Sequence, residues 1–208
     1  MSIKNLLDKA FSFIFLILLS PLFILIAILI KLDSKGPVMF IQERVGKDNK
    51  LFNIYKFRTM VIDAVNMGSG VYTEENDPRI TQVGRFMRKT SLDELPQLLN
   101  ILKGEMSFIG PRPTLEYQVK QYNDFQKKRL LMKPGVTGLA QINGRNSISW
   151  LERIKYDVQY VENYSLGLDF KILIKTFLVI LKQEGLYSEK EKFLINDEKK
   201  VSDETEDI

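Results

Sequence analysis

Two adjacent carboxylates, Asp93 and Glu94, follow a cation-rich stretch that contains Arg85 and Arg88. The chain has no histidine and no cysteine, so it can form no His/Cys metal site, no thiolate nucleophile and no serine–histidine triad. Any catalysis must therefore come from carboxylates, hydroxyls, lysines or arginines, or from a metal ion held by oxygen atoms. An aspartate can carry a covalent phosphoryl group without histidine, which makes this pair a candidate centre for phosphoryl chemistry.

The same pair also fits a helix-capping pattern. Ser91 with Glu94, and Thr90 with Asp93, both match S/T-x-x-E/D, in which the side chains bind the amides of a helical first turn. In the alternative interpretation, one carboxylate is a nucleophile or a metal ligand, and nearby arginines hold a phosphate. A divalent cation bound by oxygens would lower the repulsion between an anionic nucleophile and an anionic pyrophosphate. The residues alone leave both interpretations open.

Three further clusters place polar side chains in rigid or glycine-containing segments. They are Lys56 and Arg58 after a β-prone run, Arg112 in a GPRP turn, and Gln141 and Arg145 in a glycine-containing loop. Such segments can present single cations and backbone donors to an anion. Cations beside a membrane can instead face lipid headgroups. A diffuse lipid patch, however, needs no proline or glycine around each arginine.

Composition and charge limit the classes of partner. The 208 residues carry a formal net charge of +4 and are 45% hydrophobic, which is enough to bury one core. Residues 188–208 hold eight acidic residues and four lysines, leaving 26 basic and 18 acidic residues in the rest of the chain. A basic body favours partners that bear phosphate: nucleic acid, anionic lipid or a phosphorylated small molecule. The acidic tail lacks a periodic apolar face and is expected to be disordered.

The N-terminal segment is a candidate membrane anchor. Residues 11–30 form a nearly unbroken apolar run, which as a straight helix would reach roughly 30 Å. Ser20 and Pro21 lie at its middle, where a proline removes an amide donor and bends the helix. Lysines flank both ends, which fits both ends lying on the cytoplasmic face. No small-residue cleavage site follows, as a signal peptide would require. A re-entrant helix–break–helix and a kinked spanning helix both remain open.

A second apolar stretch, residues 168–181, is too short to span a bilayer. It carries Lys171 and Lys175 four residues apart, as on one side of a helix. An interfacial helix on the membrane surface and an ordinary core helix explain this stretch equally well.

The remaining chain predicts a mainly helical domain with a little β-structure. Two β-prone runs, 38–42 and 50–57, are separated by Gly-Lys-Asp-Asn and predict a hairpin. Residues 63–78 are polar and glycine-containing, which is typical of a long binding loop. Apolar periodicity and stop signals predict helices over 80–89, 95–102, 116–132 and 149–164, and a loop over 135–146.

The motifs taken together resemble a known family. They are the Ser20-Pro21 break, KFRTM (56–60), DPRITQVGRFMRKTSLDELPQL (77–98), LKGEMSFIGPRP (102–113) and KPGVTGLAQINGRN (133–146). In this order they resemble the small monotopic phosphoglycosyl transferases, members of the bacterial sugar transferase family, from about residue 11 to about residue 181. The loop 66–76 and the acidic tail do not share the family pattern, so the donor sugar and the glycan pathway stay open.

The resemblance implies a reaction and a role for each matching residue. Asp93 would attack the β-phosphate of a UDP-sugar, release UMP and carry the sugar-phosphate, and Glu94 would position Mg²⁺ or the acceptor. A polyprenol phosphate, typically undecaprenyl phosphate, would then accept the sugar-phosphate in the first membrane step of polysaccharide or glycoconjugate assembly. Asp93 and Glu94 are also the implied Mg²⁺ ligands. The implied substrate-binding residues are Arg88 and Arg112, with Lys56, Arg58, Gln141 and Arg145 as further pocket residues.

The resemblance also implies an architecture. The fold would be mostly α with short β elements (α+β), in a monotopic membrane protein on the cytoplasmic face of the bacterial inner membrane. Residues 1–35 would form the re-entrant membrane hairpin broken at Ser20 and Pro21, residues 36–187 the catalytic core with interfacial helices, and residues 188–208 the acidic tail. The expected partners are the UDP-sugar, the polyprenol phosphate and the phospholipid bilayer. Nucleic acid is not expected, and a homodimer is left open.

Overall fold

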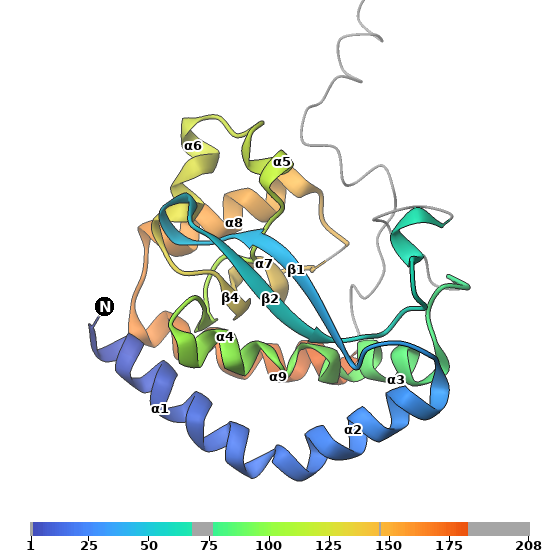
Figure 1. Ribbon diagram of the computed structural model, residues 1–208. Coiled ribbons are helices and arrows are strands. Elements are labelled where there is room, and N and C mark those ends of the chain that lie inside the picture. The colour runs from blue at the N-terminus through green and yellow to red at the C-terminus, as the bar shows by residue number, and fades with distance from the viewer. Residues whose placement is uncertain (1, 68–76, 146, 183–208) are drawn as a thin grey trace, which may run out of the picture.

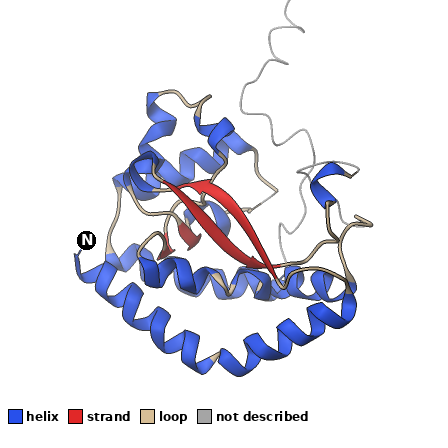
Figure 2. Cartoon of the chain, in the orientation of Figure 1, coloured by secondary structure: helices blue, strands red, loops and turns tan. Residues whose placement is uncertain are grey.

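The computed structural model of the protein describes residues 2–67, 77–145 and 147–182. In these residues the chain is mostly helical with two small two-stranded sheets, which confirms the mostly α fold with short strands (Figure 2). The expected acidic tail and most of the expected 63–78 loop lie outside the described residues.

The N-terminal segment forms two helices, α1 (Ser2–Leu18) and α2 (Ser20–Asp33), bent by 62°. They form the V along the lower edge of Figure 1. Pro21 has no amide hydrogen to donate to the carbonyl of Ile17, and the hydroxyl of Ser20 donates to that carbonyl instead, at 2.8 Å. The bend expected at Ser20 and Pro21 is therefore present, with a local hydrogen bond that explains its position.

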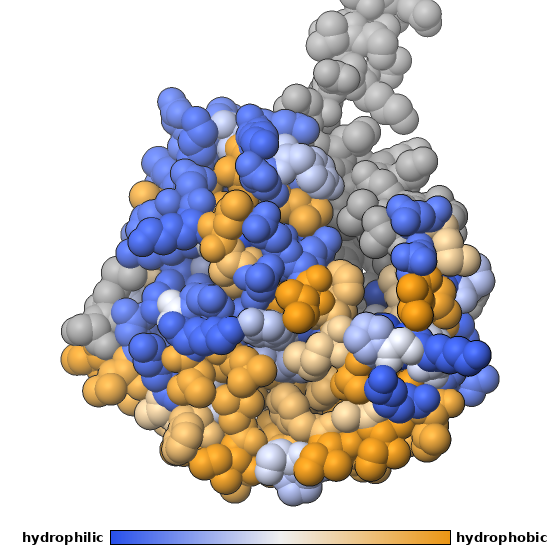
Figure 3. Space-filling model, in the orientation of Figure 1, coloured by the Kyte–Doolittle hydropathy of each residue, from blue (hydrophilic) through white to orange (hydrophobic). Residues whose placement is uncertain are grey.

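No single described helix is both long and apolar enough to cross a bilayer, whereas α1 and α2 taken together pass that test of length and composition. The outward side chains of both helices are large and apolar, including Phe13, Ile17, Ile24 and Ile28. Figure 3 shows a mostly hydrophobic lower edge, interrupted by paler atoms at its lowest point, beneath a hydrophilic body.

Buried polar contacts join α1 to the rest of the protein. Near its start, Nζ of Lys4 lies 2.6 Å from a carboxylate oxygen of Asp169 in α9 (Leu166–Lys182). Further along, the hydroxyl of Ser12 donates to the main-chain oxygen of Leu98 in α4 (Gln97–Lys103) at 2.5 Å. Helix α1 is therefore held against α9 and α4 at two points along its length.

The predicted hairpin is confirmed. Strands β1 (Met39–Val45) and β2 (Leu51–Phe57) pair antiparallel, with Met39 opposite Phe57, and they cross the middle of the molecule (Figure 1). A short parallel pair, β3 (Ser107–Ile109) and β4 (Gly135–Thr137), was not predicted. It requires glycine at residue 135, because a Cβ there would lie 2.1 Å from the nitrogen of Gly110.

Helices α3 (Gln82–Thr90) and α4 confirm the two predictions for residues 80–102. Thr81 caps the start of α3 by accepting a hydrogen bond from the amide of Gly84. Gly104 ends α4 at a φ of 84°, a left-handed conformation that glycine adopts without strain.

The single helix predicted over residues 116–132 is wrong. The segment forms α5 (Glu116–Val119), α6 (Asp124–Lys127) and a 3-10 turn from Lys128 to Leu131. Asn123 interrupts the first helix because its side chain accepts a hydrogen bond from the amide of Gln126 and thereby starts a new one.

The last helices follow a short α7 (Leu139–Ile142). Helix α8 (Trp150–Glu162) begins at a Ser149 capping box and confirms the prediction for residues 149–164. In α9, Asp169 and Ile172 face the core, whereas Phe170, Ile174 and Phe177 are exposed. Only one narrow side of α9 therefore packs into the protein core, and its other apolar side chains are exposed.

Candidate active site

Asp93 and Glu94 lie on a 3-10 turn, Leu92–Glu94, between α3 and α4. Ser91 precedes the turn at a φ of 58° and ends α3. The side chain of Ser91 makes no capping hydrogen bond, and the hydroxyl of Thr90 donates to the main-chain oxygen of Phe86. The capping interpretation is therefore wrong, and the two carboxylates are not used to start a helix.

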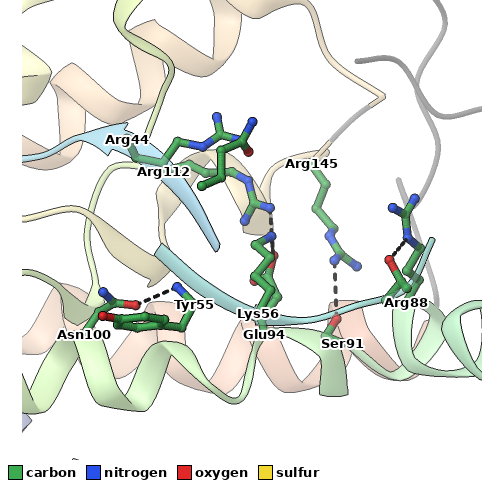
Figure 4. Close-up of polar contacts among 11 residues, drawn as sticks. Arg44, Tyr55, Lys56, Arg88, Ser91, Glu94, Asn100, Arg112 and Arg145 are labelled. Carbon is green, nitrogen blue, oxygen red and sulfur yellow. Dashed lines mark hydrogen bonds and ion pairs between the residues drawn. The ribbon is translucent and has the colours of Figure 1, made fainter. Parts of the chain in front are cut away.

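Apolar packing against α2, β2 and α3 holds the 3-10 turn in place. Leu92 and Leu95 pack on a buried cluster formed by Ile26 and Ile30 of α2, Phe57 of β2 and Met87 of α3. Because these leucines flank the carboxylate pair, the hydrophobic contacts hold the turn in place. Glu94, between them, reaches the side chain of Lys56 (Figure 4).

Glu94 is held by two cations. Its Oε1 accepts hydrogen bonds from Nζ of Lys56 at 2.7 Å and from Nη2 of Arg112 at 2.8 Å, and its side chain is only 14% exposed. Burial by itself would raise the pKa of Glu94, but the charges and hydrogen bonds of Arg112 and Lys56 outweigh burial and lower that pKa below its usual range. Glu94 is consequently a permanent anion that fixes Lys56 and Arg112.

Asp93 is in a different state. No hydrogen bond or ion pair within the described part of the chain engages its carboxylate. Burial raises the pKa of Asp93 to about 6, opposed by the charge of Lys56 and reinforced by that of Glu94. A partly buried carboxylate that is ionised near neutral pH and bound to no neighbour is available as a nucleophile or a ligand.

Two more cations approach from other segments. Nε of Arg88 donates to the hydroxyl of Thr59 at 2.9 Å, and Nη2 of Arg145 donates to the hydroxyl of Ser91 at 3.4 Å (Figure 4). The charge of Arg88, like that of Arg112, lowers the pKa of Asp93. The structure thus brings Lys56, Arg88, Arg112 and Arg145 close to the carboxylate pair.

Beside this pair lies a pocket that we call the arginine pocket. It is lined by Arg112, Arg129, Gln141, Arg145, Arg153 and Asp157, with Trp150 at its wall. Arg112 belongs to both places, because its guanidinium lines the pocket and also binds Glu94. The pocket therefore opens beside the carboxylate pair.

The bacterial sugar transferase family matches residues 1–183 of the chain. The protein is a member of the bacterial sugar transferase family. It is 42% identical over 199 residues to an undecaprenyl-phosphate galactose phosphotransferase of Salmonella typhimurium, covering 89% of this chain and 42% of that protein.

Two other relatives are as similar. An uncharacterized sugar transferase of Bacillus subtilis, EpsL, is 44% identical over 187 residues, covering 89% of this chain and 91% of the relative. A UDP-glucose:undecaprenyl-phosphate glucose-1-phosphate transferase of Klebsiella pneumoniae is 44% identical over 190 residues, covering 88% of this chain and 40% of the relative. The chain thus spans about two fifths of the length of the Salmonella and Klebsiella proteins.

Arg58 does not join the other predicted site residues. It is buried, and its guanidinium donates to the main-chain oxygens of Ser34 and Lys35, just beyond α2. The contact with Ser34 is 2.9 Å long. These carbonyls follow the last turn of a helix, where a cation is favoured. Arg58, the first residue after β2, therefore links that strand to the end of α2.

Four buried residues of the arginine pocket were missed: Arg129, Trp150, Arg153 and Asp157. A signal for three of them was present, because residues 150, 153 and 157 share one face of the predicted helix 149–164. Arg129 carried no such signal, since it lies where the single predicted helix does not exist.

The carboxylates near the site limit the kind of metal ion that could bind there. In the residues that the structure describes, no three or more acidic side chains form a cluster that could hold a metal ion. Asp93 and Glu94 together offer two adjacent carboxylates, and only one Glu94 oxygen is engaged by cations. Mg²⁺ commonly binds one or two carboxylates together with substrate phosphates and waters. The two carboxylates therefore fit an ion shared with a phosphorylated ligand, not one enclosed by protein.

Proposed function

We propose that this protein transfers a sugar-1-phosphate from a UDP-sugar to polyprenol phosphate and releases UMP. The observation that carries the proposal is Asp93, a carboxylate without a partner in the described structure, surrounded by Lys56, Arg88 and Arg112. The names of the Salmonella and Klebsiella relatives support undecaprenyl phosphate as acceptor, and that of the Klebsiella relative supports a UDP-sugar donor.

The proposed reaction has two halves, and the first forms a covalent intermediate on Asp93. A carboxylate oxygen of Asp93 attacks the β-phosphorus of the UDP-sugar and forms an acyl phosphate bond. The bond from the β-phosphorus to the bridging oxygen breaks, and UMP leaves with that oxygen and its electron pair. Arg88, Arg112 and Lys56 offset the negative charge that Asp93 and the two phosphates bring together.

The second half regenerates the enzyme. A phosphate oxygen of the polyprenol phosphate attacks the same phosphorus and forms the diphosphate bond. The acyl phosphate bond breaks, and Asp93 leaves as a carboxylate. Glu94 remains an anion throughout, because Lys56 and Arg112 keep its pKa low against the effect of burial, so its role is to hold those cations in position.

Asp93 and Glu94 would also hold Mg²⁺ in this proposal. When bound with the donor, the ion would supply charge that offsets the repulsion between the carboxylates and the diphosphate. The free Glu94 oxygen and the Asp93 carboxylate are the groups available for it among the described residues.

We place the active site at the cytoplasmic face of the inner membrane, with α1 and α2 dipping into one leaflet. Both ends of the helix pair are tied to the same body, by Lys4 to Asp169 at the start and by Arg58 to Ser34 at the end. A body on one side of the bilayer therefore keeps both ends there. The acceptor phosphate lies at the same surface, within reach of a water-soluble donor.

The proposal is tested by UMP release from a panel of UDP-sugars with detergent-solubilised protein and undecaprenyl phosphate. Asp93→Asn should abolish UMP release, while the exposed Asp124→Asn, a matched charge removal, should retain it. Full turnover by Asp93→Asn would remove Asp93 from its assigned role. Release of UDP in place of UMP would mean ordinary glycosyl transfer and a different reaction.

A further inference from the structure

Two lysines from distant segments meet beside Gly104, at the end of α4. A Cβ placed on Gly104 would lie 3.6 Å from Nζ of Lys9 in α1 and 3.6 Å from Nζ of Lys133, which precedes β4. The two ammonium groups are therefore no farther apart than twice that distance. Neither forms a side-chain hydrogen bond or an ion pair within the described part of the chain. Two like charges are thus brought together without a counter-ion.

The surroundings of Lys133 carry an excess of positive charge. Burial lowers the pKa of Lys133, and the charges of Lys9 and Lys47 lower that pKa further, whereas the charge of Asp8 opposes them. Three lysines thus face one aspartate, which leaves an excess of two positive charges. A nearby anion favours the charged form of a lysine, so an anion bound between Lys9 and Lys133 would offset their mutual repulsion.

The end of α4 does not itself require these two cations. The carbonyls of Asn100 and Ile101, in its last turn, accept hydrogen bonds from the main-chain amides that follow the helix. The lysine of that turn, Lys103, donates to the hydroxyl of Tyr55 at 2.6 Å. Cations are favoured near the C-terminus of a helix, but satisfied carbonyls do not explain why two lysines from other segments converge there.

Lys9 interrupts an exposed apolar strip of α1, the helix that runs beneath α4 in Figure 1. Leu6 and Phe13, three residues before it and four residues after it, lie on the same side of the helix. Their side chains are 70% and 55% exposed. The ammonium group of Lys9 therefore lies where exposed hydrocarbon side chains meet the polar body. A ligand with a negative charge and hydrocarbon chains matches both features, whereas a free phosphate matches the cations alone.

We propose that Lys9 and Lys133 bind the phosphate of an anionic phospholipid, whose acyl chains lie along the exposed apolar side chains of α1. The inference rests on the proposed placement of α1 in the membrane, and it adds a lipid site separate from the catalytic one. Gly104 lies at the opposite end of α4 from the 3-10 turn that carries the carboxylate pair. A bound headgroup joins α1, the end of α4 and the segment before β4 at the membrane surface.

Native mass spectrometry of the full chain in detergent tests the site with dioctanoyl-phosphatidylglycerol as the anionic lipid and dioctanoyl-phosphatidylcholine as the zwitterionic lipid. The unchanged protein should bind the phosphatidylglycerol about fivefold more tightly or better. Lys9→Gln and Lys133→Gln should each raise the Kd for phosphatidylglycerol about fivefold and leave the Kd for phosphatidylcholine unchanged. The matched control is Lys155→Gln, which changes an exposed lysine on α8 and should bind both lipids as the unchanged protein does.

Folded Lys9→Gln and Lys133→Gln that bind phosphatidylglycerol as tightly as the control would overturn the proposal, and so would equal binding of the two lipids by the unchanged protein. Inorganic phosphate distinguishes a lipid headgroup from a soluble anion. An excess of it should not displace phosphatidylglycerol, and full displacement would mean a site for free phosphate and would overturn the lipid assignment. The titration contains no UDP-sugar, so it decides the lipid site even if the protein releases no UMP, a result by which only the proposed function fails.

Discussion

Nη2 of Arg129 donates a hydrogen bond to the main-chain oxygen of Arg112 at 2.8 Å. Arg129 is 2% exposed, and it also forms an ion pair with Asp157 and a hydrogen bond to the hydroxyl of Tyr122. One buried guanidinium thus fixes the turn from which Arg112 reaches Glu94. The position of the cation beside the candidate nucleophile depends on a residue that does not contact Asp93 or Glu94 in any hydrogen bond.

Replacing Arg129 should therefore lower stability strongly. Arg129→Met leaves Asp157 as a buried carboxylate without its ion-pair partner, which typically costs about 3–5 kcal/mol. Lys128→Met is the matched control, because the pair of Lys128 with Glu162 is half exposed and worth about 0–1 kcal/mol. Denaturant unfolding in detergent measures both free energies of unfolding. Similar losses for the two variants would contradict the role of the buried pair.

The rate of the first half-reaction should depend on the ionisation of Asp93. Burial raises the pKa of this carboxyl to about 6, and only the carboxylate form attacks phosphorus. Single-turnover UMP release should be level above about pH 7 and should fall about tenfold for each pH unit below 6. A profile that stays level down to pH 4.5 would show that the attacking group has an ordinary or lowered pKa.

Asp93→Asn should make the protein more stable at neutral pH. The folded-state pKa of Asp93 is about 6, above the ordinary value of about 3.9 for an unfolded chain. Between these values the folded state binds more protons than the unfolded state, so the contribution of Asp93 to stability falls as pH rises. We expect Asp93→Asn to gain on the order of 1–2 kcal/mol at pH 8 and less near pH 4.5, measured by unfolding at both pH values. Asp124→Asn, fully exposed, should show no such difference.

The bend at Ser20 and Pro21 should determine the topology of the membrane segment. The chain has no cysteine, so Lys9→Cys and Lys35→Cys, both at exposed positions, each provide a unique label. In membrane vesicles with the cytoplasmic face outward, an impermeant maleimide should label both variants. Labelling of the two positions from opposite sides would indicate a spanning helix. Adding Ser20→Leu and Pro21→Leu should favour a straight helix and reduce labelling at residue 9.

Local signals were sufficient for most of the elements near the site. The hairpin could be predicted from β-prone runs around a glycine turn, and α3, α4 and α8 from apolar periodicity with recognisable start and stop residues. The helix over 116–132 failed because Asn123 starts a second helix within a stretch of otherwise helical composition. The pair β3 and β4 was missed because parallel pairing depends on contacts between distant segments, which three-residue strands do not reveal.

The part of the candidate site that rests on local sequence signals could also be predicted. Asp93, Glu94 and the arginines in rigid turns could be recognised as residue types in unusual local settings. The sequence could not show whether Ser91 caps a helix, because the S-x-x-E pattern does not reveal that Ser91 takes a left-handed conformation and makes no side-chain capping hydrogen bond. Arg58 was assigned to the pocket with Lys56, because residues two apart lie on the same face of an extended strand. The strand β2 ends at Phe57, however, and Arg58 binds the main-chain oxygen of Ser34 beyond α2, a distant contact that the local sequence does not reveal.

The most direct test of the central claim is the mass of the intact protein after incubation with a UDP-sugar and Mg²⁺ in the absence of acceptor. We expect an added mass equal to one sugar-phosphate, located by peptide mapping to Asp93, removed on addition of undecaprenyl phosphate and absent from Asp93→Asn. Complete turnover with no adduct at any stage, or an adduct that persists in Asp93→Asn, would contradict it.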